Sequence, residues 1–96
     1  MNITANEIDV IISSALDNLD LIQTLTDCIT DIMSFDEDSA HWIGMSVREM
    51  VTNAIQHGNK LDINKKVDIC FEVAPDQLSI SIRDQGSGFR DSDVPN

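Results

Sequence analysis

The sequence predicts an α+β two-layer sandwich, in which helices cover one face of an antiparallel or mixed sheet. Three observations support this fold class: two helical segments with apolar stripes, a clear strand hairpin, and a length of 96 residues. A chain of that length hides only about 60–65% of the surface that its unfolded form exposes, so it builds one modest core. We therefore expect a single domain over residues 1–96.

Three segments show the period-two alternation that is typical of strands. The first covers 7–13, and the other two, 67–73 and 78–83, flank the turn 74–77. This pair predicts an antiparallel hairpin with one apolar face that helices can cover. The tail 90–96 is polar, so we expect three strands and either an exposed sheet edge or a missing element. The apolar positions are Ile8, Val10 and Ile12 with Ile11 added, then Val67, Ile69, Phe71 and Val73, then Leu78, Ile80 and Ile82.

A first helix follows the first strand and ends near Ser34, and either Asn18 or Asp20 can cap its start. Cys28 lies in this helical pattern and Cys70 lies on a strand. The two cysteines have no metal-ligand spacing, so we expect buried or half-buried free thiols without chemistry. The apolar positions of the helix, at three-and-four spacing, are Ile22, Leu25, Ile29 and Ile32, with Met33 beside them.

A second helix runs from about Ser39 to His57. The acidic run 36–38 lies just ahead of it, where negative charge meets the positive end of the helix dipole. Gly58 is expected to end the helix, because glycine takes the left-handed conformation at little cost. The buried stripe comprises Ile43, Val47, Met50 and Ala54, widened by Trp42, Val51 and Ile55.

The charge of the chain is strongly negative, with 17 acidic and 6 basic residues and a formal net charge of −11. No lysine or arginine precedes Arg48. Such a chain repels phosphate backbones and anionic lipid, so we expect neither nucleic acid nor a membrane as a partner. Two interpretations remain open, a solvated acidic surface and a docking face for a basic protein. Residues 1–4 lack the basic region of a signal peptide, so we expect a cytoplasmic protein.

Three polar residues of the second helix, Glu49, Asn53 and His57, are spaced by four and share one stripe. A carboxylate, a carboxamide and an imidazole beside the apolar stripe lie at the edge of the helix–sheet interface, where a cleft forms. The alternative is a solvated polar face that ends with a histidine near the helix C-terminus.

A second motif begins with Asp84, which closes the last predicted strand. Gly86 and Gly88 follow at alternate positions and remove side chains where a flat ligand approaches the backbone. The alternative is an ordinary loop that leaves a strand.

Together, E-x-x-x-N-A-x-x-H-G on a helix and D-x-G-x-G-F at a strand end resemble the N-box and first glycine box of the GHKL superfamily, which includes gyrase, histidine kinases and mismatch-repair ATPases. Within it, the run 49–59 resembles the anti-sigma-factor serine kinases, as does the helix opening 18–22. The resemblance covers nearly the whole chain and implies a Bergerat-type fold. Nothing after Phe89 matches the second glycine box, so we expect the domain to be partial, without that box or the last strand.

The resemblance implies an ATP site whose adenine end is formed by Asp84, Gly86 and Gly88. An ionised Asp84 accepts a hydrogen bond from the exocyclic amine of adenine, whereas guanine presents a carbonyl oxygen there. A charged hydrogen bond of this kind contributes about 1.5–3 kcal/mol. The two glycines let the backbone lie against the base.

The resemblance also implies a phosphate end on the second helix. Asn53 offers an oxygen ligand to Mg²⁺, which takes its other ligands from phosphates and water. Glu49 acts as general base or orients the nucleophile, and His57 either contacts the phosphates or only finishes the helix.

The implied function is an ATP-binding regulator that holds a sigma factor and phosphorylates a serine on an anti-anti-sigma-type antagonist. One alternative is a non-catalytic module that binds a nucleotide or a protein. Another is the ATP domain of a sensor histidine kinase, which requires a phosphoacceptor helix hairpin upstream, whereas position 1 lies almost at the first strand. An exposed sheet edge leads us to expect self-association, for example as a homodimer.

Overall fold

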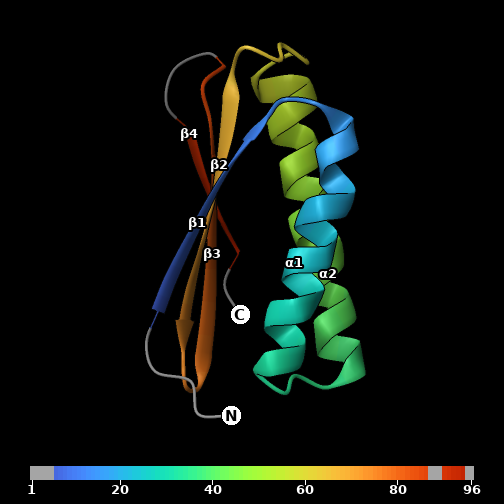
Figure 1. The fold of residues 1–96 in the computed structure, drawn as a ribbon, viewed down its shortest axis with the longest axis vertical. Coiled ribbons are helices and arrows are strands. Elements are labelled where there is room, and N and C mark those ends of the chain that lie inside the picture. Colours follow the sequence, from blue (N-terminus) through green and yellow to red (C-terminus); the bar gives the residue numbers. More distant parts are fainter. Residues whose placement is uncertain (1–5, 87–89, 95–96) are drawn as a thin grey trace.

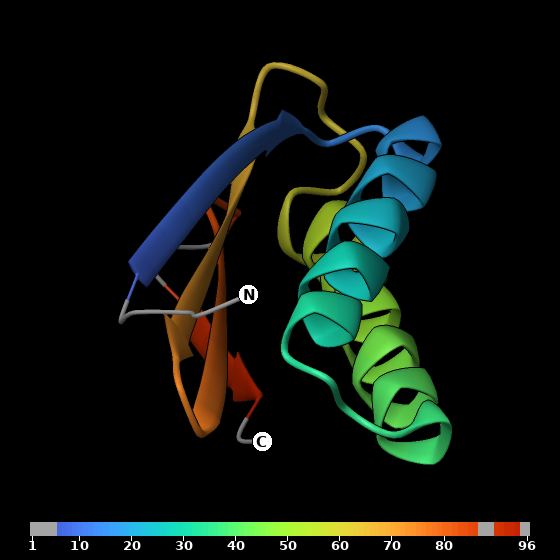
Figure 2. The ribbon, with the colours of Figure 1, turned by 60° about the horizontal axis from the view of Figure 1, so that its bottom comes forward.

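The fold is a four-stranded antiparallel sheet with two helices on one face (Figures 1 and 2). The structure is a computed structural model that describes residues 6–86 and, for the backbone, 90–94. The sheet order is β1-β2-β3-β4, so the predicted α+β two-layer sandwich is confirmed. The strands are β1 (Asn6–Ser13), β2 (Lys66–Ala74), β3 (Gln77–Asp84) and β4 (Arg90–Val94).

The helical layer lies between β1 and β2 in the sequence. A 3-10 turn, η1 (Leu16–Asn18), leads into α1 (Leu19–Ile32), and α2 (Glu37–Asn53) continues into a π-helical turn, η2 (Ala54–Gly58). In Figures 1 and 2, α1 and α2 run antiparallel, side by side, on the same face of the sheet. Among the described helices, none combines the length and the apolar content that a bilayer crossing requires.

The helix starts differ in how they are capped. The Asp36 side chain accepts a hydrogen bond from the Ser39 N–H at 2.7 Å, so α2 begins two residues before the predicted start. Asn18 occupies the cap position of α1 but makes no capping bond there. Its Nδ2 donates instead to the Ser13 carbonyl at 2.9 Å, which ties the helix start to the end of β1.

The core lies between the two layers and follows the predicted alternation of the strands. Two predicted helix positions are wrong, since Trp42 is 69% exposed and Ile32 is 43% exposed. Trp42 lies roughly 200° around α2 from the buried Gly44, at about 100° per residue, so it faces solvent. The buried apolar residues are Ile12, Leu19, Ile22, Ile29, Val47, Val51, Ala54, Ile55, Val67, Ile69, Phe71, Val73, Leu78, Ile80 and Ile82.

The predicted hairpin is confirmed and is slightly longer than expected, with Cys70 opposite Ser81 in its register. The expectation of three strands is wrong. The polar tail forms β4, whose register places Arg90 opposite Asp84 and Val94 opposite Ile80. The strand β1 lies at one end of the sheet order, so its outer edge has no neighbouring strand within the described part of the chain.

The predicted role of Gly58 as a left-handed helix stop is wrong. Among the described non-glycine residues, Ser34, Lys60 and Leu61 have positive φ, whereas Gly58 lies outside the left-handed region. The π-helical turn is closed by a 2.8 Å hydrogen bond from the Asn59 N–H to the Ala54 carbonyl. The chain therefore turns after Asn59, and Gly58 has a different function.

The two cysteines differ in exposure. Cys70 is half-buried on β2, as predicted, but Cys28 is exposed on α1, so the expectation of a buried or half-buried thiol there is wrong. Position 28 lies on the solvent side of α1, between the buried Ile22 and Ile29 in sequence but away from them around the helix.

Candidate functional site

The three polar residues that the sequence places on one stripe of the second helix lie at the surface. Glu49, Asn53 and His57 are all exposed. Glu49 and Asn53 line one open hollow of about 280 Å³ together with Met45, Arg48 and Thr52. The structure therefore brings the predicted carboxylate and carboxamide together, and it places His57 one turn later, in η2.

Asp84 lies at the end of β3 and is only 5% exposed. Its Oδ1 accepts a hydrogen bond from the Gly86 N–H at 3.1 Å. The carboxylate also lies directly against Gly58, so close that a Cβ built on Gly58 would overlap it. Gly58 is therefore required because it leaves room for Asp84, and any side chain at position 58 would displace the carboxylate.

The backbones of the two motifs also touch. A Cβ built on Gly86 would overlap the carbonyl oxygen of Gly58. The glycine that ends the helix motif and the first glycine of the strand-end motif are thus in direct contact, although 27 positions separate them in the sequence. Gly88 lies outside the described residues. The sequence predicted Asp84 and Gly86 as site residues but missed Gly58, because a glycine after a helix normally indicates a stop.

Asn59 is the second residue that the sequence reasoning missed. It is fully buried, and its side chain bonds three separate segments. Its Nδ2 donates to Ser14 Oγ at 2.7 Å and to the Lys66 carbonyl at 2.9 Å, and its Oδ1 accepts from the Gln85 N–H at 2.8 Å. Its position directly after the His-Gly pair was the available signal, but burial of an asparagine cannot be read from sequence.

The two ends of the predicted site are joined by a single π-helical turn. Asn53 closes α2 and Gly58 closes η2, with His57 between them. At about 1.5 Å of rise per residue, Asn53 and Gly58 are separated by roughly 6–8 Å along the helix axis. Asp84 does not line the Glu49–Asn53 hollow. The convergence of Asn53 and Asp84 on one nucleotide stays a prediction.

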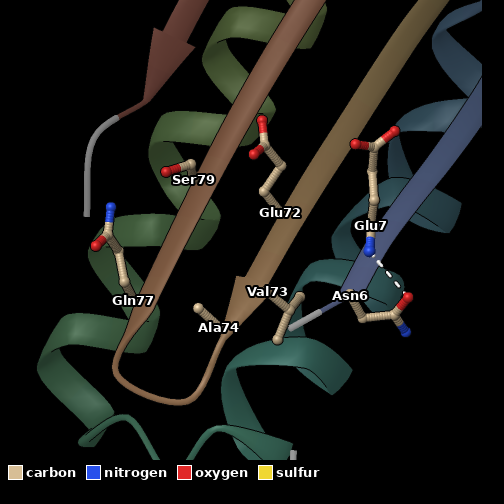
Figure 3. A pocket seen from close by; sticks show the side chains of 7 residues that line it. All are labelled: Asn6, Glu7, Glu72, Val73, Ala74, Gln77 and Ser79. Carbon is tan, nitrogen blue, oxygen red and sulfur yellow. Dashed lines mark hydrogen bonds between the residues drawn. The ribbon is translucent and has the colours of Figure 1, made fainter. Parts of the chain in front are cut away.

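A larger hollow, of about 440 Å³, lies at the opposite end of the sheet. Figure 3 shows Glu7, Glu72 and Ser79 there on the strand face in front of the helices. This hollow adjoins the β2–β3 turn. It therefore lies a strand length from Asp84, about 23 Å for the eight residues of β3, and is separate from the contact between the motifs.

The outer face of the sheet is acidic, and this changes the protonation of Asp68. A hydrogen bond with the side chain of Asp9 raises the pKa of Asp68 to about 6, with further increases from burial and from the negative charge of Asp9. The positive charge of Arg83 acts in the opposite direction. Burial raises the pKa of the Cys70 thiol on the same face, and the surrounding carboxylates raise it further.

The described side chains form no group of three or more histidines, cysteines or carboxylates that could hold a metal ion. The role of Asn53 as a Mg²⁺ ligand stays a prediction. Mg²⁺ commonly takes one or two protein ligands and completes its shell with phosphates and water.

Comparisons with known proteins show the family to which the chain belongs. The model of the histidine kinase-like ATPase domain matches residues 12–96. Serine-protein kinase RsbW of Bacillus subtilis is 28% identical over 89 residues, which cover 93% of this chain and 56% of the relative. RsbW of Bacillus licheniformis is 36% identical over 61 residues, 64% of this chain and 38% of the relative. The anti-sigma F factor of Shouchella clausii is 47% identical over 47 residues, 49% of this chain and 32% of the relative.

The chain thus spans about half the length, or less, of these curated relatives. The family match nevertheless covers both motifs, the two helices and strands β2 to β4. This chain belongs to the histidine kinase-like ATPase family of the GHKL superfamily, where it is similar to anti-sigma-factor serine kinases.

Proposed function

We propose that this chain binds Mg-ATP and acts as an anti-sigma-type regulator that phosphorylates a serine of an antagonist protein. The observation that carries the proposal is the contact of Gly58, Asp84 and Gly86, because it joins the helix motif to the strand-end motif. A buried carboxylate beside two glycine backbones suits a flat base that carries an amino group.

At the adenine end, Asp84 accepts the hydrogen bond of the exocyclic amine, and its burial strengthens that bond by excluding water. Gly86 keeps the neighbouring surface free of side chains, and we propose that Gly88 belongs to the same site. The residues present therefore fit an adenine nucleotide. Guanine is disfavoured, because its carbonyl oxygen would face the Asp84 carboxylate.

At the phosphate end, Asn53 supplies an oxygen ligand for Mg²⁺, and Glu49, which shares its hollow, accepts the proton of the attacking hydroxyl. His57 follows Asn53 along the chain, in η2, and is proposed to contact the phosphates. When bound, ATP supplies the phosphoryl group that is transferred. An exposed Glu49 suits a hydroxyl that arrives on another protein.

The proposed partners are a sigma factor and an anti-anti-sigma-type protein that carries the serine, and the proposed compartment is the cytoplasm. Relatives named as a serine-protein kinase and as an anti-sigma F factor support this choice. The excess of acidic residues supports a basic docking surface on one of the partners.

The test measures nucleotide binding first. The affinities of the chain for Mg-ATP and Mg-GTP are compared by calorimetry, and the expected preference for ATP is about 10- to 150-fold, the equivalent of one charged hydrogen bond. Equal affinities for the two nucleotides would remove adenine recognition from the proposal.

Phosphotransfer is measured next, with γ-labelled ATP and an anti-anti-sigma-type protein from the same organism. Glu49→Ala should abolish transfer and leave the Mg-ATP affinity within about twofold, because it removes the base and no binding contact. Glu37→Ala, in the first turn of α2, is the control that should transfer normally. Nucleotide binding without transfer in the unaltered chain would favour the alternative of a non-catalytic binding module.

A further inference from the structure

The side chain of Asn59 joins the ends of three strands at the place where the two motifs meet. Through Nδ2 it contacts Ser14, directly after β1, and Lys66, at the start of β2. Through Oδ1 it contacts Gln85, directly after β3. All hydrogen-bonding groups of the amide except one oxygen lone pair are thus used, as a fully buried carboxamide requires.

The chemistry of the partners fixes the orientation of this amide. The Lys66 carbonyl can only accept and the Gln85 N–H can only donate, so Nδ2 must face the first and Oδ1 the second. Ser14 Oγ donates to the Lys65 carbonyl at 2.7 Å and accepts from Asn59. The amide therefore has one arrangement, and it holds the strand ends at fixed separations.

The bond to Gln85 has a direct effect on the carboxylate of the candidate site. Gln85 follows Asp84, and Asn59 follows Gly58, so the Asn59–Gln85 bond lies one residue beyond each member of the Gly58–Asp84 contact. Gln85 is held a second time, since its Oε1 accepts from the Lys66 N–H at 2.6 Å. Loss of the first bond would let the end of β3 move away from η2, and Asp84 would move with it.

From these contacts we infer that Asn59 is a positioning residue for nucleotide selectivity: it sets where the Asp84 carboxylate lies relative to the base. The inference rests on the proposed function. It gives Asn59 no contact with nucleotide, because the side chain is fully enclosed by protein. Its effect passes through the backbone of Gln85 to Asp84.

The test compares the full chain with Asn59→Ala, Asn59→Asp and Thr26→Ala. Thr26 is the matched structural control, because it is equally buried and donates its hydroxyl to Ile22 O within α1, away from the site. Dissociation constants for Mg-ATP and Mg-GTP are measured for each variant, together with its melting temperature. Asn59→Asp keeps an oxygen for the Gln85 N–H and loses the donors of Nδ2.

Asn59→Ala should weaken Mg-ATP binding about tenfold and bring the ATP-to-GTP preference toward one. Asn59→Asp should retain more of that preference than Asn59→Ala, since the bond to Gln85 survives. Thr26→Ala should lower the melting temperature and leave the preference unchanged. A wild-type preference in Asn59→Ala would overturn the inference and leave the proposed function intact, whereas no preference in the unaltered chain would overturn both.

A second measurement needs no variant. In the unaltered chain, amide hydrogen exchange of Gln85 should be slow compared with that of Asp76 in the exposed β2–β3 turn, and Mg-ATP should slow it further. A Gln85 amide that exchanges as fast as that of Asp76, with or without Mg-ATP, would overturn the inference even if Asn59→Ala fails to fold.

Discussion

At the scale of single residues, the candidate site depends on a carboxylate, Asp84, that packs against the backbone of a glycine. Asp84 is buried beside Gly58, and its Oδ1 accepts a hydrogen bond from the Gly86 N–H. Asp84 and Gly86 were proposed as site residues from the resemblance of their motif to the first glycine box, and these roles stay predictions. Sequence reasoning did not find the roles of Gly58 and Asn59 described above, because these roles depend on contacts with other segments, among them the contacts with Asp84 and Gln85 26 positions away, which a local pattern does not contain.

Replacement of Asp84 by asparagine tests adenine recognition directly. Asp84→Asn keeps an oxygen for the Gly86 N–H but loses the charge that strengthens the bond to the exocyclic amine. We expect Mg-ATP affinity to fall about tenfold or more while the circular dichroism spectrum is unchanged. Asp76→Asn, in the β2–β3 turn, is the control with the same charge change. An Asp84→Asn variant that binds as tightly as Asp76→Asn would exclude Asp84 from the site.

Replacement of Gly58 by alanine tests the close approach. The new Cβ overlaps the Asp84 carboxylate, so Gly58→Ala should lower the free energy of unfolding by about 1–3 kcal/mol, as overpacking does, and weaken nucleotide binding. In Gly44→Ala the new Cβ meets the end of the flexible Gln23 side chain, and alanine favours the helix by up to about 1 kcal/mol. Chemical denaturation compares the two. Equal stability of both variants would contradict the crowding at Gly58.

At the scale of the elements, apolar periodicity was sufficient for the two helices and the first three strands. It failed for β4, because 90–94 is polar apart from its last residue and has no alternation to recognise. That strand pairs with β3, whose edge offers free backbone groups regardless of side-chain type. The inward face of α2 was also predicted wrongly at Trp42. The helix has more apolar residues than fit on one buried face, and the sequence alone did not show that Trp42 faces solvent.

Asp68, on the outer face of the sheet, is expected to make the stability of the folded protein depend on pH. The pKa of Asp68 is raised to about 6 by Asp9 and by burial, compared with 3.8 for the unfolded chain. Between these values the folded protein keeps a proton that the unfolded chain has released, so stability falls as the pH rises from about 3.8 to about 6 and levels off above that. Asp68→Asn should remove this loss.

We expect Asp68→Asn to raise the free energy of unfolding by up to about 1 kcal/mol at pH 7.5, a value reduced for solvent screening, and to have no such effect at pH 3.5. Urea denaturation at the two pH values measures it. Asp76→Asn serves again as control, since Asp76 is exposed in a turn. A gain of the same size at both pH values would show that the charge of Asp68 is not its origin.

At the scale of the whole molecule, two layers enclose one core and leave β1 at an end of the sheet order. Ile11 projects from β1 away from the core and is 62% exposed. Within the described residues, the outer edge of β1 has no neighbouring strand, and such an edge beside an exposed apolar residue favours association with a second copy. The sequence led us to expect either an exposed sheet edge or a missing element, and it placed too few strands in the sheet.

Sedimentation equilibrium tests this association. Ile11→Lys should raise the dissociation constant of the self-associated form about tenfold or more, because burying an isoleucine contributes about 1.5–3 kcal/mol. Ile63→Lys is the matched control, since Ile63 is 63% exposed in the loop before β2. A chain that stays monomeric at all concentrations, with or without Ile11→Lys, would contradict association through β1.

The contact between Gly58 and Gly86 has a consequence for how this sequence can change over time. Every amino-acid replacement of either glycine adds atoms that collide with the partner motif, so neither position can vary alone. A saturation-mutagenesis screen for nucleotide binding would therefore find both glycines as intolerant as Asp84. Two positions that carry no functional group would thus rank beside the one that carries the charge.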